Sequence, residues 1–466
     1  MKADSLMKVA SWYTISRILV LTLSFISIPI FTHLLSPNEF GEFAIYTMWI
    51  AMLTPFVGLG LHMSIGRAKV EFKERYKQYV SSIVFLLLIL LIIALVTLST
   101  FESFFVGVIN YPSHWLYLII VQTFMSLFIN TVFCMFQFNG MYKQLAIVTF
   151  LQMLVSLLLS IYFVNFFFEE NKAEGRIFGV FFIDLILGCA LCIYAFVYGR
   201  CYVNMKFWAF GIKYSTPFIL GSLSYIINGQ FDRLLINEYL GAAEAGIYSF
   251  SYSIGMLLLT LAIAVKQALN PWVYEQLDNG QKTPVKVVYK HYIIVFSLLA
   301  VIMLHATPEL ITLLSKESYW DGLSILPWIV LAAYIQVLIL NESETQMFLK
   351  KTLVNSSVVV VGAILNIVLN YMFIPKYGSM GAVVTTVVTY AFMLVLLLLI
   401  NINVLHFKLV SNRVYLMSLI YILASTTIFF LVKDSLVMRF VLIIFNLSLL
   451  FLYYMKKKKT SQKALC

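Results

Sequence analysis

Three cations stand inside long apolar stretches of this sequence, namely Arg17, Arg233 and Lys266. A charge held at the centre of a bilayer costs about 2.5–3.5 kcal/mol even on lenient insertion scales, so each cation predicts a functional position that faces the interior of a helix bundle. A guanidinium binds phosphate oxygens bidentately, and an ammonium binds them as a point charge. The chemistry that these residues offer is therefore the binding of a phosphate-bearing molecule.

The first cation lies on a polar face of its predicted helix. At 100° per residue, Tyr13, Arg17 and Ser24 share one side. A polar stripe with a cation near its cytoplasmic end suits an entering pyrophosphate, so we take these three residues as candidates for substrate binding. The alternative is that Arg17 only extends its charge to the membrane surface.

A second polar stripe falls near residue 230. Tyr225, Asn228 and Asp232 share one helical face, and Arg233 lies at its side. Two interpretations remain open for this group: a structural ion pair with a neighbour such as Asp184, or a cavity site that meets the substrate or couples to an ion.

Lys266 and a few carboxylates complete the candidates. Lys266 is a substrate-binding candidate, although it lies near a predicted helix end from which its side chain could reach the surface. The candidates for ion coupling are four acidic residues: Asp184, Asp232, Glu342 and Glu344. For Glu342 and Glu344 the alternative is simple solvation or pairing with Lys350.

The elements that must position these residues are membrane-spanning helices. The 466 residues are 62% hydrophobic and only 11% charged, with a mean hydropathy of +0.93, and a soluble chain of this size would expose far more charge. Apolar runs long enough to cross about 30 Å of hydrocarbon recur along the chain. The predicted spans are 9–35, 43–65, 80–100, 114–137, 147–168, 177–198, 214–240, 247–270, 291–314, 323–346, 354–374, 380–403, 414–432 and 438–455.

Charge asymmetry predicts the orientation of these spans. With the N-terminus in the cytoplasm, 23 of the 32 Lys and Arg residues fall on the cytoplasmic side, six fall on the opposite side and three fall within spans. Lys and Arg concentrate in cytoplasmic loops of membrane proteins. We therefore expect a multi-pass protein with both ends in the cytoplasm, and we interpret the net charge of +11 as membrane topology rather than as a sign of nucleic-acid binding.

Several classes of function lack their usual residues here. Cys189 and Cys192 have no second ligand pair, so we expect small packing residues and no metal. No glycine-rich phosphate loop is present, and we expect no cofactor. The connections are too short for the outer domain that membrane glycan polymerases and ligases generally need, so we do not expect an enzyme.

A repeat predicts the internal organisation. The turn Leu35-Ser36-Pro37-Asn38-Glu39-Phe40-Gly41 returns as Leu240-Gly241-Ala242-Ala243-Glu244-Ala245-Gly246, with Leu, Glu and Gly in register at an offset of 205 (240 minus 35). Six spans per copy give both copies the same orientation, which is a parallel repeat. The expected fold is all-α and integral to the membrane: six-helix bundles at 1–205 and 206–405 around a central cavity, then two further helices and a basic tail at 406–466.

These motifs resemble those of a known family. The stretch from Arg17 through Ile28-Pro29-Ile30 to Gly41, the segment from Asp232-Arg233 to Tyr248-Ser249, and Pro375-Lys376-Tyr377-Gly378-Ser379-Met380-Gly381-Ala382 are similar to polysaccharide-transport flippases. These are the Wzx-type O-antigen flippases of the multidrug/oligosaccharidyl-lipid/polysaccharide (MOP) exporter superfamily. The resemblance covers about residues 1–405, and the fourteen expected spans are similar in number to those of the lipid II flippases in that superfamily.

The resemblance implies the function. It implies export of an undecaprenyl-pyrophosphate-linked oligosaccharide, such as an O-antigen unit of lipopolysaccharide, from the cytoplasmic to the outer leaflet of a bacterial inner membrane. We expect alternating access driven by an ion gradient, with the lipid-linked oligosaccharide and membrane lipids as partners, and with a polysaccharide polymerase and chain-length regulator as further candidate partners. We favour a monomer. The alternatives are a cation-coupled multidrug exporter of the same superfamily, a lipid II-type flippase and, with less support, a glycan polymerase or ligase.

Overall fold

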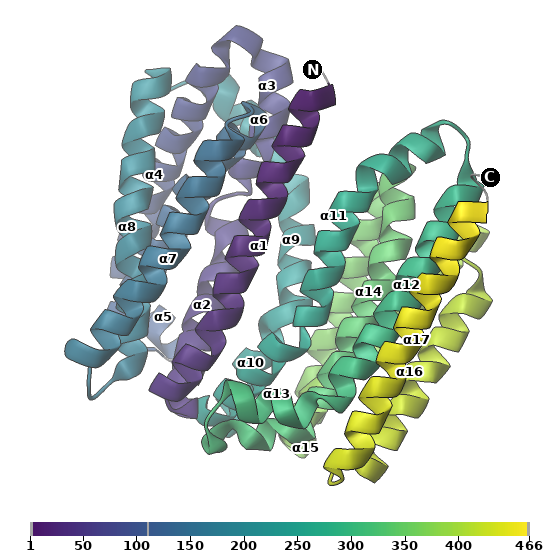
Figure 1. The fold of residues 1–466 in the computed structure, drawn as a ribbon. Coiled ribbons are helices and arrows are strands. Elements are labelled where there is room, and N and C mark those ends of the chain that lie inside the picture. Colours follow the sequence, from purple (N-terminus) through teal and green to yellow (C-terminus); the bar gives the residue numbers. More distant parts are fainter. Residues whose placement is uncertain (1–2, 110, 464–466) are drawn as a thin grey trace. The chain divides into compact units, whose positions relative to one another are not determined.

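The fold is known from a computed structural model that describes residues 3–109 and 111–463, except for the side chains of 3–18, 108, 454 and 456–463. Every regular element in these residues is a helix. The chain forms two compact units, Met1–Leu234 and Leu235–Cys466 (Figure 1). The predicted division at residue 205 falls where α9 (Met205–Leu240) begins, and the boundary of the compact units lies further along the same helix.

The first unit contains the helices up to α9 and most of α9 itself, as far as Leu234. Its elements are α1 (Ala3–Leu34), α2 (Pro37–Val57), η1 (Leu61–Met63), α3 (Ser64–Phe72), η2 (Lys73–Arg75), α4 (Tyr76–Thr100), α5 (Glu102–Ile109), α6 (Ser113–Phe138), α7 (Tyr142–Phe166) and α8 (Lys172–Gly199). α7 packs against α1 and α8, and α4, α6 and α8 pack against one another around an apolar core.

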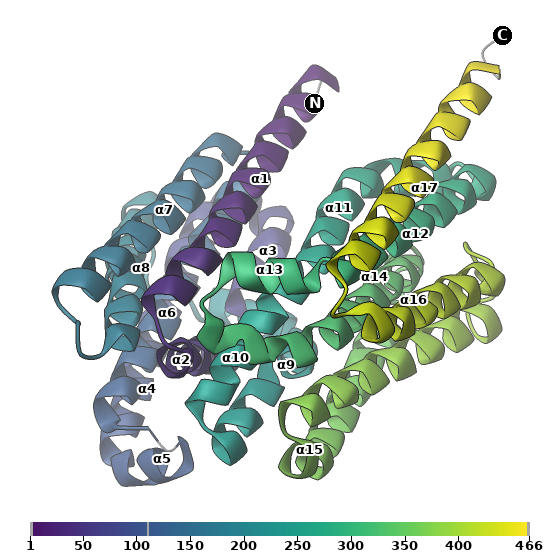
Figure 2. The same ribbon diagram turned by 60° about the horizontal axis from the view of Figure 1, so that its bottom comes forward.

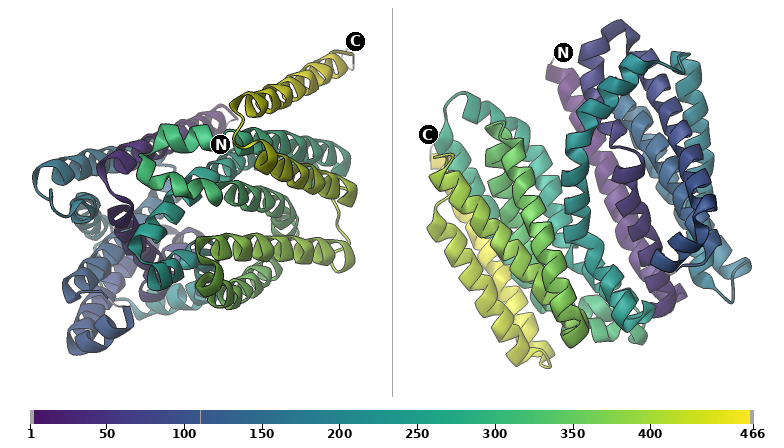
Figure 3. Two further views of the ribbon diagram at one scale, coloured as in Figure 1. Left: turned by 90° about the horizontal axis from the view of Figure 1, so that it is seen from below. Right: turned by 180° about the vertical axis from the view of Figure 1, so that it is seen from behind.

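The second unit contains the rest of the chain. Its elements are α10 (Ala242–Gly255), α11 (Leu257–Asp278), α12 (Lys282–His305), α13 (Thr307–Leu314), η3 (Glu317–Ser324), α14 (Leu326–Phe348), α15 (Thr352–Asn403), α16 (Asn412–Val432) and α17 (Leu436–Lys463). α14 packs along α15, and α12 packs against α14, α16 and α17 (Figure 3).

Membrane-spanning character is confirmed. In the described residues, eleven helices or joined helices are long and apolar enough to cross a membrane, and each coincides with one or two predicted spans. α15 contains both 354–374 and 380–403. The two predicted spans are separated by a bend at Gly378, whose φ of 61° and ψ of −145° are not helical. The all-α membrane fold is therefore correct, whereas the total of fourteen spans stays a prediction.

A carboxylate fixes the start of α2. Ser36 and Glu39 form a capping box: the Ser36 side chain accepts from the Glu39 N–H, and the Glu39 Oε2 accepts from the Ser36 N–H at 2.7 Å. The Glu39 Oε1 also accepts from the backbone N–H of Lys172 at 3.1 Å, so it joins the α1–α2 turn to the start of α8. The predicted span 43–65 starts earlier because of this cap, and it ends at Val57 because Leu59 and Gly60 adopt positive φ.

A similar carboxylate stands at the start of α10. Gly241, with φ of 90°, ends α9 and allows α10 to begin at Ala242, the same 205 residues beyond Pro37 as in the sequence repeat (242 minus 37). The Glu244 Oε1 accepts from the Ser379 hydroxyl at 2.7 Å, which ties the α9–α10 turn to the bend of α15. The two glutamates stand at corresponding positions of the predicted repeat (244 minus 39 is 205), and their partners Lys172 and Ser379 are 207 residues apart.

Pro308 divides the predicted span 291–314. α12 ends at His305, and the short helix α13 continues with Pro308 in its first turn. Both α13 and α10 pack against η3 (Figure 2).

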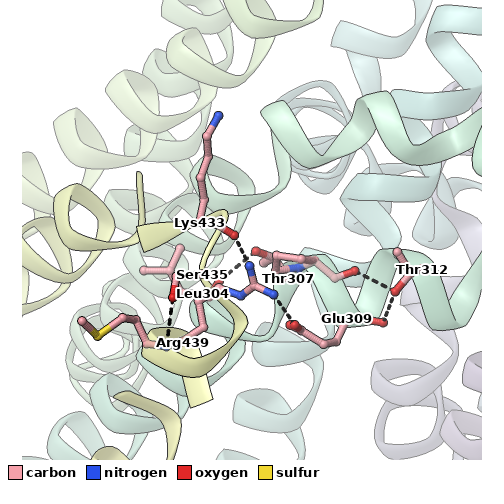
Figure 4. A network of polar contacts seen from close by, with 9 residues as sticks. Leu304, Thr307, Glu309, Thr312, Lys433, Ser435 and Arg439 are labelled. Atoms are coloured by element: carbon pink, nitrogen blue, oxygen red, sulfur yellow. Dashed lines mark hydrogen bonds and ion pairs between the residues drawn. The ribbon is translucent and has the colours of Figure 1, made fainter. Parts of the chain in front are cut away.

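An ion pair holds the last helix to α13. Arg439 of α17 is buried, and its guanidinium donates to the Glu309 carboxylate and to the Lys433 backbone carbonyl (Figure 4). Arg439 and Lys433 are two of the six Lys and Arg residues that the predicted topology places on the side opposite the cytoplasm, and the structure places Arg439 in a buried contact.

Candidate functional site: polar side chains inside the spans

A buried carboxylate joins four helices of the first unit. Asp184 on α8 is 7% exposed, and its two oxygens accept from the side-chain amides of Gln122 on α6 at 2.9 Å and Gln152 on α7 at 2.8 Å. Tyr46 on α2 donates its hydroxyl to the Gln122 Oε1 at 2.6 Å. Neutral amides satisfy the carboxylate oxygens without a cation, so this cluster could gain a proton while keeping its packing.

The polar stripe of α9 is only partly buried. Tyr225 is 65% exposed, whereas Asn228 and Asp232 are buried. The Asn228 amide donates to the Ser224 carbonyl at 2.9 Å, and the Asp232 Oδ1 accepts from the Arg233 backbone N–H at 3.2 Å. The three residues share a helical face as predicted, but of the three only Tyr225 has an exposed side chain.

The polar face of α1 is described only in part. α1 includes Tyr13 and Arg17, but their side chains lie outside the described residues. Ser24 is partly buried and donates its hydroxyl to the Val20 carbonyl of its own helix at 3.0 Å. The role predicted for Arg17 stays a prediction.

The second unit brings together three charged residues that the sequence separates. Lys266 on α11 is 3% exposed, and its Nζ lies 3.7 Å from the ring centroid of Tyr289 and 5.1 Å from that of Tyr292, both on α12. The carboxylates whose charge acts on it belong to Glu344 and Glu342 of α14. Aromatic faces attract an ammonium electrostatically, so the two rings offset part of the cost of burying a charge at this position.

Glu344 and Glu342 point toward different helices. Glu344 accepts from the Asn270 amide at 2.8 Å and from the Tyr274 hydroxyl at 3.0 Å, both on α11. Glu342 accepts from the Asn401 amide of α15 at 2.7 Å and from the hydroxyl of Tyr415 on α16. Both carboxylates are thus held by neutral donors, and neither is paired with Lys350, the exposed residue that the sequence offered as a partner.

α15 adds a neutral polar group on both sides of its bend. The Asn370 amide donates to the Asn366 Oδ1 at 3.0 Å, and Thr385 donates its hydroxyl to the Asn370 Oδ1. Hydrogen bonds of this kind commonly join helices in membranes.

Sequence reasoning missed the uncharged partners of the charged residues. Gln122, Gln152, Asn270 and Asn401 orient the carboxylates, and the sequence signal for each was an amide inside an apolar span. Without the fold, an amide that bonds to a carboxylate cannot be told from one that bonds to a backbone carbonyl, as Asn228 does. Tyr289 could not have been selected among the 28 tyrosines of the chain.

Known proteins share this fold. The lipid II flippase MurJ, in an inward closed conformation, superimposes with a TM-score of 0.72 at 12% identity, over 96% of this chain and 100% of MurJ. A multidrug resistance MATE family transporter of the MOP superfamily, in an inward-facing conformation, gives 0.60 at 14% identity, over 83% of this chain and 97% of the transporter.

The sequence comparisons define the family. An uncharacterized membrane protein of Haemophilus influenzae is 25% identical over 356 residues, which are 73% of this chain and 81% of that protein. Residues 6–276 match the polysaccharide biosynthesis protein family, whose match includes the Arg17, Asp184, Asp232 and Lys266 positions. With more than half of its length in that match and with the fold of the MOP exporters, this multi-pass membrane chain belongs to the polysaccharide biosynthesis protein family.

Proposed function

We propose that this chain is a flippase that moves an undecaprenyl-pyrophosphate-linked oligosaccharide from the cytoplasmic to the outer leaflet by alternating access. The observation that carries the proposal is the combination of the polysaccharide biosynthesis family match with a MurJ-like fold over 96% of the chain. The MATE transporter covers only 83% of it. The fuller coverage by a flippase of a lipid-linked substrate favours a lipid-linked substrate here also.

The chemistry of such a substrate explains why charged residues are kept in the spans. Sugar hydroxyls and phosphates cost several kcal/mol each to move into hydrocarbon without compensating hydrogen bonds, so a protein must supply polar partners during transfer. A guanidinium suits the pyrophosphate because it can donate two parallel hydrogen bonds to phosphate oxygens. Arg17 and Arg233 are the proposed partners of the head group.

The test replaces Arg17. We expect Arg17→Ala to lower the rate of lipid-linked oligosaccharide translocation in proteoliposomes by about ten- to a hundredfold, because hydrogen bonds to charged groups contribute about 1.5–3 kcal/mol. Arg17→Lys keeps the charge but loses the bidentate geometry, so its rate should lie between the two. Lys350→Ala, at an exposed cation outside the spans, should translocate at the wild-type rate. A wild-type rate for Arg17→Ala would contradict the role of Arg17 with the head group.

The alternative is a cation-coupled multidrug exporter. The MATE-like fold and the buried carboxylates Asp184 and Asp232 favour it, since a cationic drug would pair with anions rather than with arginines. Deletion of the gene separates the two: loss of surface polysaccharide with unchanged sensitivity to dyes supports the flippase, and the reverse result supports the exporter.

A further inference from the structure

A layer of polar side chains lies between α11 and α14 in the second unit. It consists of Lys266 and Asn270 on α11 and of Asn341 and Glu344 on α14, and we refer to it as the α11–α14 layer. Asn341 is 1% exposed, so it is as deeply buried as Lys266. α11 and α14 pack directly against each other.

The register of the two helices brings these four residues to neighbouring levels. Glu244 and Ile247 of α10, which leads into α11, line one hollow together with Ser324 and Ile325 at the start of α14, so the two helices run in the same direction. The Asn270–Glu344 hydrogen bond of 2.8 Å fixes the register. One turn earlier on each helix, about 4.5–6 Å along the axis, stand Lys266 and Asn341.

Several polar atoms of the layer are buried and have no hydrogen-bond partner in the part of the chain that the structure describes. They are the Lys266 Nζ, the Asn270 Oδ1 and both polar atoms of the Asn341 amide. Each such atom costs about 1–3 kcal/mol if nothing satisfies it. Their gathering at one level of one helix pair therefore indicates a site that takes up a small polar species or a proton.

The composition of the layer favours a proton over a metal ion. Glu344 is its one carboxylate, because Glu342 of the same helix bonds to α15 and α16, and Lys266 is its one basic residue. The other titratable groups beside the layer are Tyr274, Tyr289 and Tyr292. A metal ion needs several oxygen ligands, and no group of three or more His, Cys, Asp or Glu side chains in the described residues could hold one. A proton needs one carboxylate oxygen and one acceptor, and the amide oxygens of Asn270 and Asn341 are such acceptors.

We propose that the α11–α14 layer is a proton-binding site in which a proton from water adds to the Glu344 carboxylate and the resulting O–H donates to an amide oxygen of Asn270 or Asn341. Release breaks that O–H bond and returns the proton to water, so nothing is oxidised or reduced. Lys266 is a positioning residue: it lies buried one turn from Asn270 on α11, and its charge acts on Glu344. We further assign this site the coupling of transport to a proton gradient, and that role rests on the proposed function. Proton binding by the layer does not depend on it.

Infrared difference spectroscopy on the full-length protein in lipid vesicles tests proton binding without any substrate. Lowering the pH should produce a carboxyl band that Glu344→Gln removes and Glu344→Asp shifts. Glu275→Gln, at an exposed glutamate of α11, is the control and should leave that band in place. A wild-type band that is unchanged in Glu344→Gln, or one that follows sodium at constant pH, would overturn the proposal.

A thermal-unfolding cycle tests the part played by Lys266. Lys266→Met should lower the melting temperature, and Glu344→Gln added to it should restore part of the loss because the surplus negative charge falls again. Lys286→Met, at an exposed lysine of α12, is the control. Additive effects of Lys266→Met and Glu344→Gln would show that the two residues act independently and would overturn the positioning role.

A transport assay distinguishes failure of the proton site from failure of the proposed flippase function. In vesicles with a proton gradient, Glu344→Gln should lower the rate of gradient-driven translocation at least about tenfold. The rate without a gradient should stay at the wild-type value. If wild-type protein translocates no lipid-linked oligosaccharide while Glu344→Gln still removes the carboxyl band, the flippase proposal fails and the proton site stands. If translocation is proton-driven in wild type and in Glu344→Gln alike, the coupling role fails and the flippase stands.

Discussion

At the scale of single residues, neutral groups surround three of the buried charged side chains of this protein. Asp184 is held by two glutamines, Glu342 by an asparagine and a tyrosine, and Lys266 by two tyrosine rings. A direct pair between opposite charges in a low-dielectric interior would be hard to break. Charges held by neutral partners can change protonation or partner at a lower cost, which suits a protein that must pass through several states.

Arg176 shows the same preference in the first unit. Its guanidinium lies 3.8 Å from the ring centroid of Phe43, 4.0 Å from that of Phe31 and 4.9 Å from that of Phe40. Because a desolvated cation–π contact contributes about 2 kcal/mol, we expect Arg176→Ala to lower the melting temperature of the purified protein clearly. Arg176→Lys should recover only part of the loss, since an ammonium cannot stack as a planar guanidinium does. Equal melting temperatures for Arg176→Ala and wild type would show that the aromatic contacts contribute nothing.

At the scale of helices, close packing in the first unit depends on glycine. A Cβ on Gly175 of α8 would lie 2.9 Å from the Val164 backbone nitrogen of α7, and one on Gly179, a turn later, would meet the backbone of Ser160. Small residues four apart let membrane helices approach closely.

We therefore expect Gly179→Leu to separate α7 from α8 and to destabilise the first unit by about 1–3 kcal/mol, the usual cost of overpacking. Thermal unfolding in detergent measures this effect. Gly107→Ala, where a Cβ meets nothing within 4 Å, is the control and should unfold as the wild type does. An unchanged transition in Gly179→Leu would mean that the α7–α8 contact contributes little to stability.

The contact between α17 and α13 gives a second prediction at this scale. Removing one partner of a buried ion pair costs about 3–5 kcal/mol, and the 33% exposure of the Glu309 side chain reduces that cost. In a double-mutant cycle, Glu309→Ala and Arg439→Ala should each destabilise the protein, and the double variant should lose little more than either one. A coupling energy of about 1–3 kcal/mol is expected. A coupling near zero would mean that α17 is held by its contacts with α12 and α16 and not by this ion pair.

At the scale of the whole molecule, the distribution of Lys and Arg predicts the orientation. With 23 of these residues on one side and six on the other, reporter fusions at residue 2 and after residue 466 should both report the cytoplasm. Fusions in the α5–α6 connection should report the opposite side. A C-terminal reporter outside the cytoplasm would mean an odd number of spans.

Length and hydropathy predicted most of the helices, because the mean hydropathy of a span is an average over all its residues and no single residue decides it. Local patterns also located single features: the turn that contains Ser36 and Glu39 was predicted, although its capping box was not, and Gly378 lies in the predicted turn where α15 bends. The site was less predictable. Lys266 was expected to meet the substrate or the membrane surface, but its burial depends on Tyr289 of the next helix, a tertiary contact that no local pattern encodes.

The two carboxylate ties also constrain how each unit can deform. Glu39 fastens the starts of α2 and α8, and Glu244 fastens the start of α10 to the bend in α15, so in both units the fastening is at the ends of helices on one face. Any rearrangement of a unit must therefore either break its tie or move the joined helix ends together. Conversion of Glu39 or Glu244 to glutamine would weaken the acceptor at each junction without changing its size.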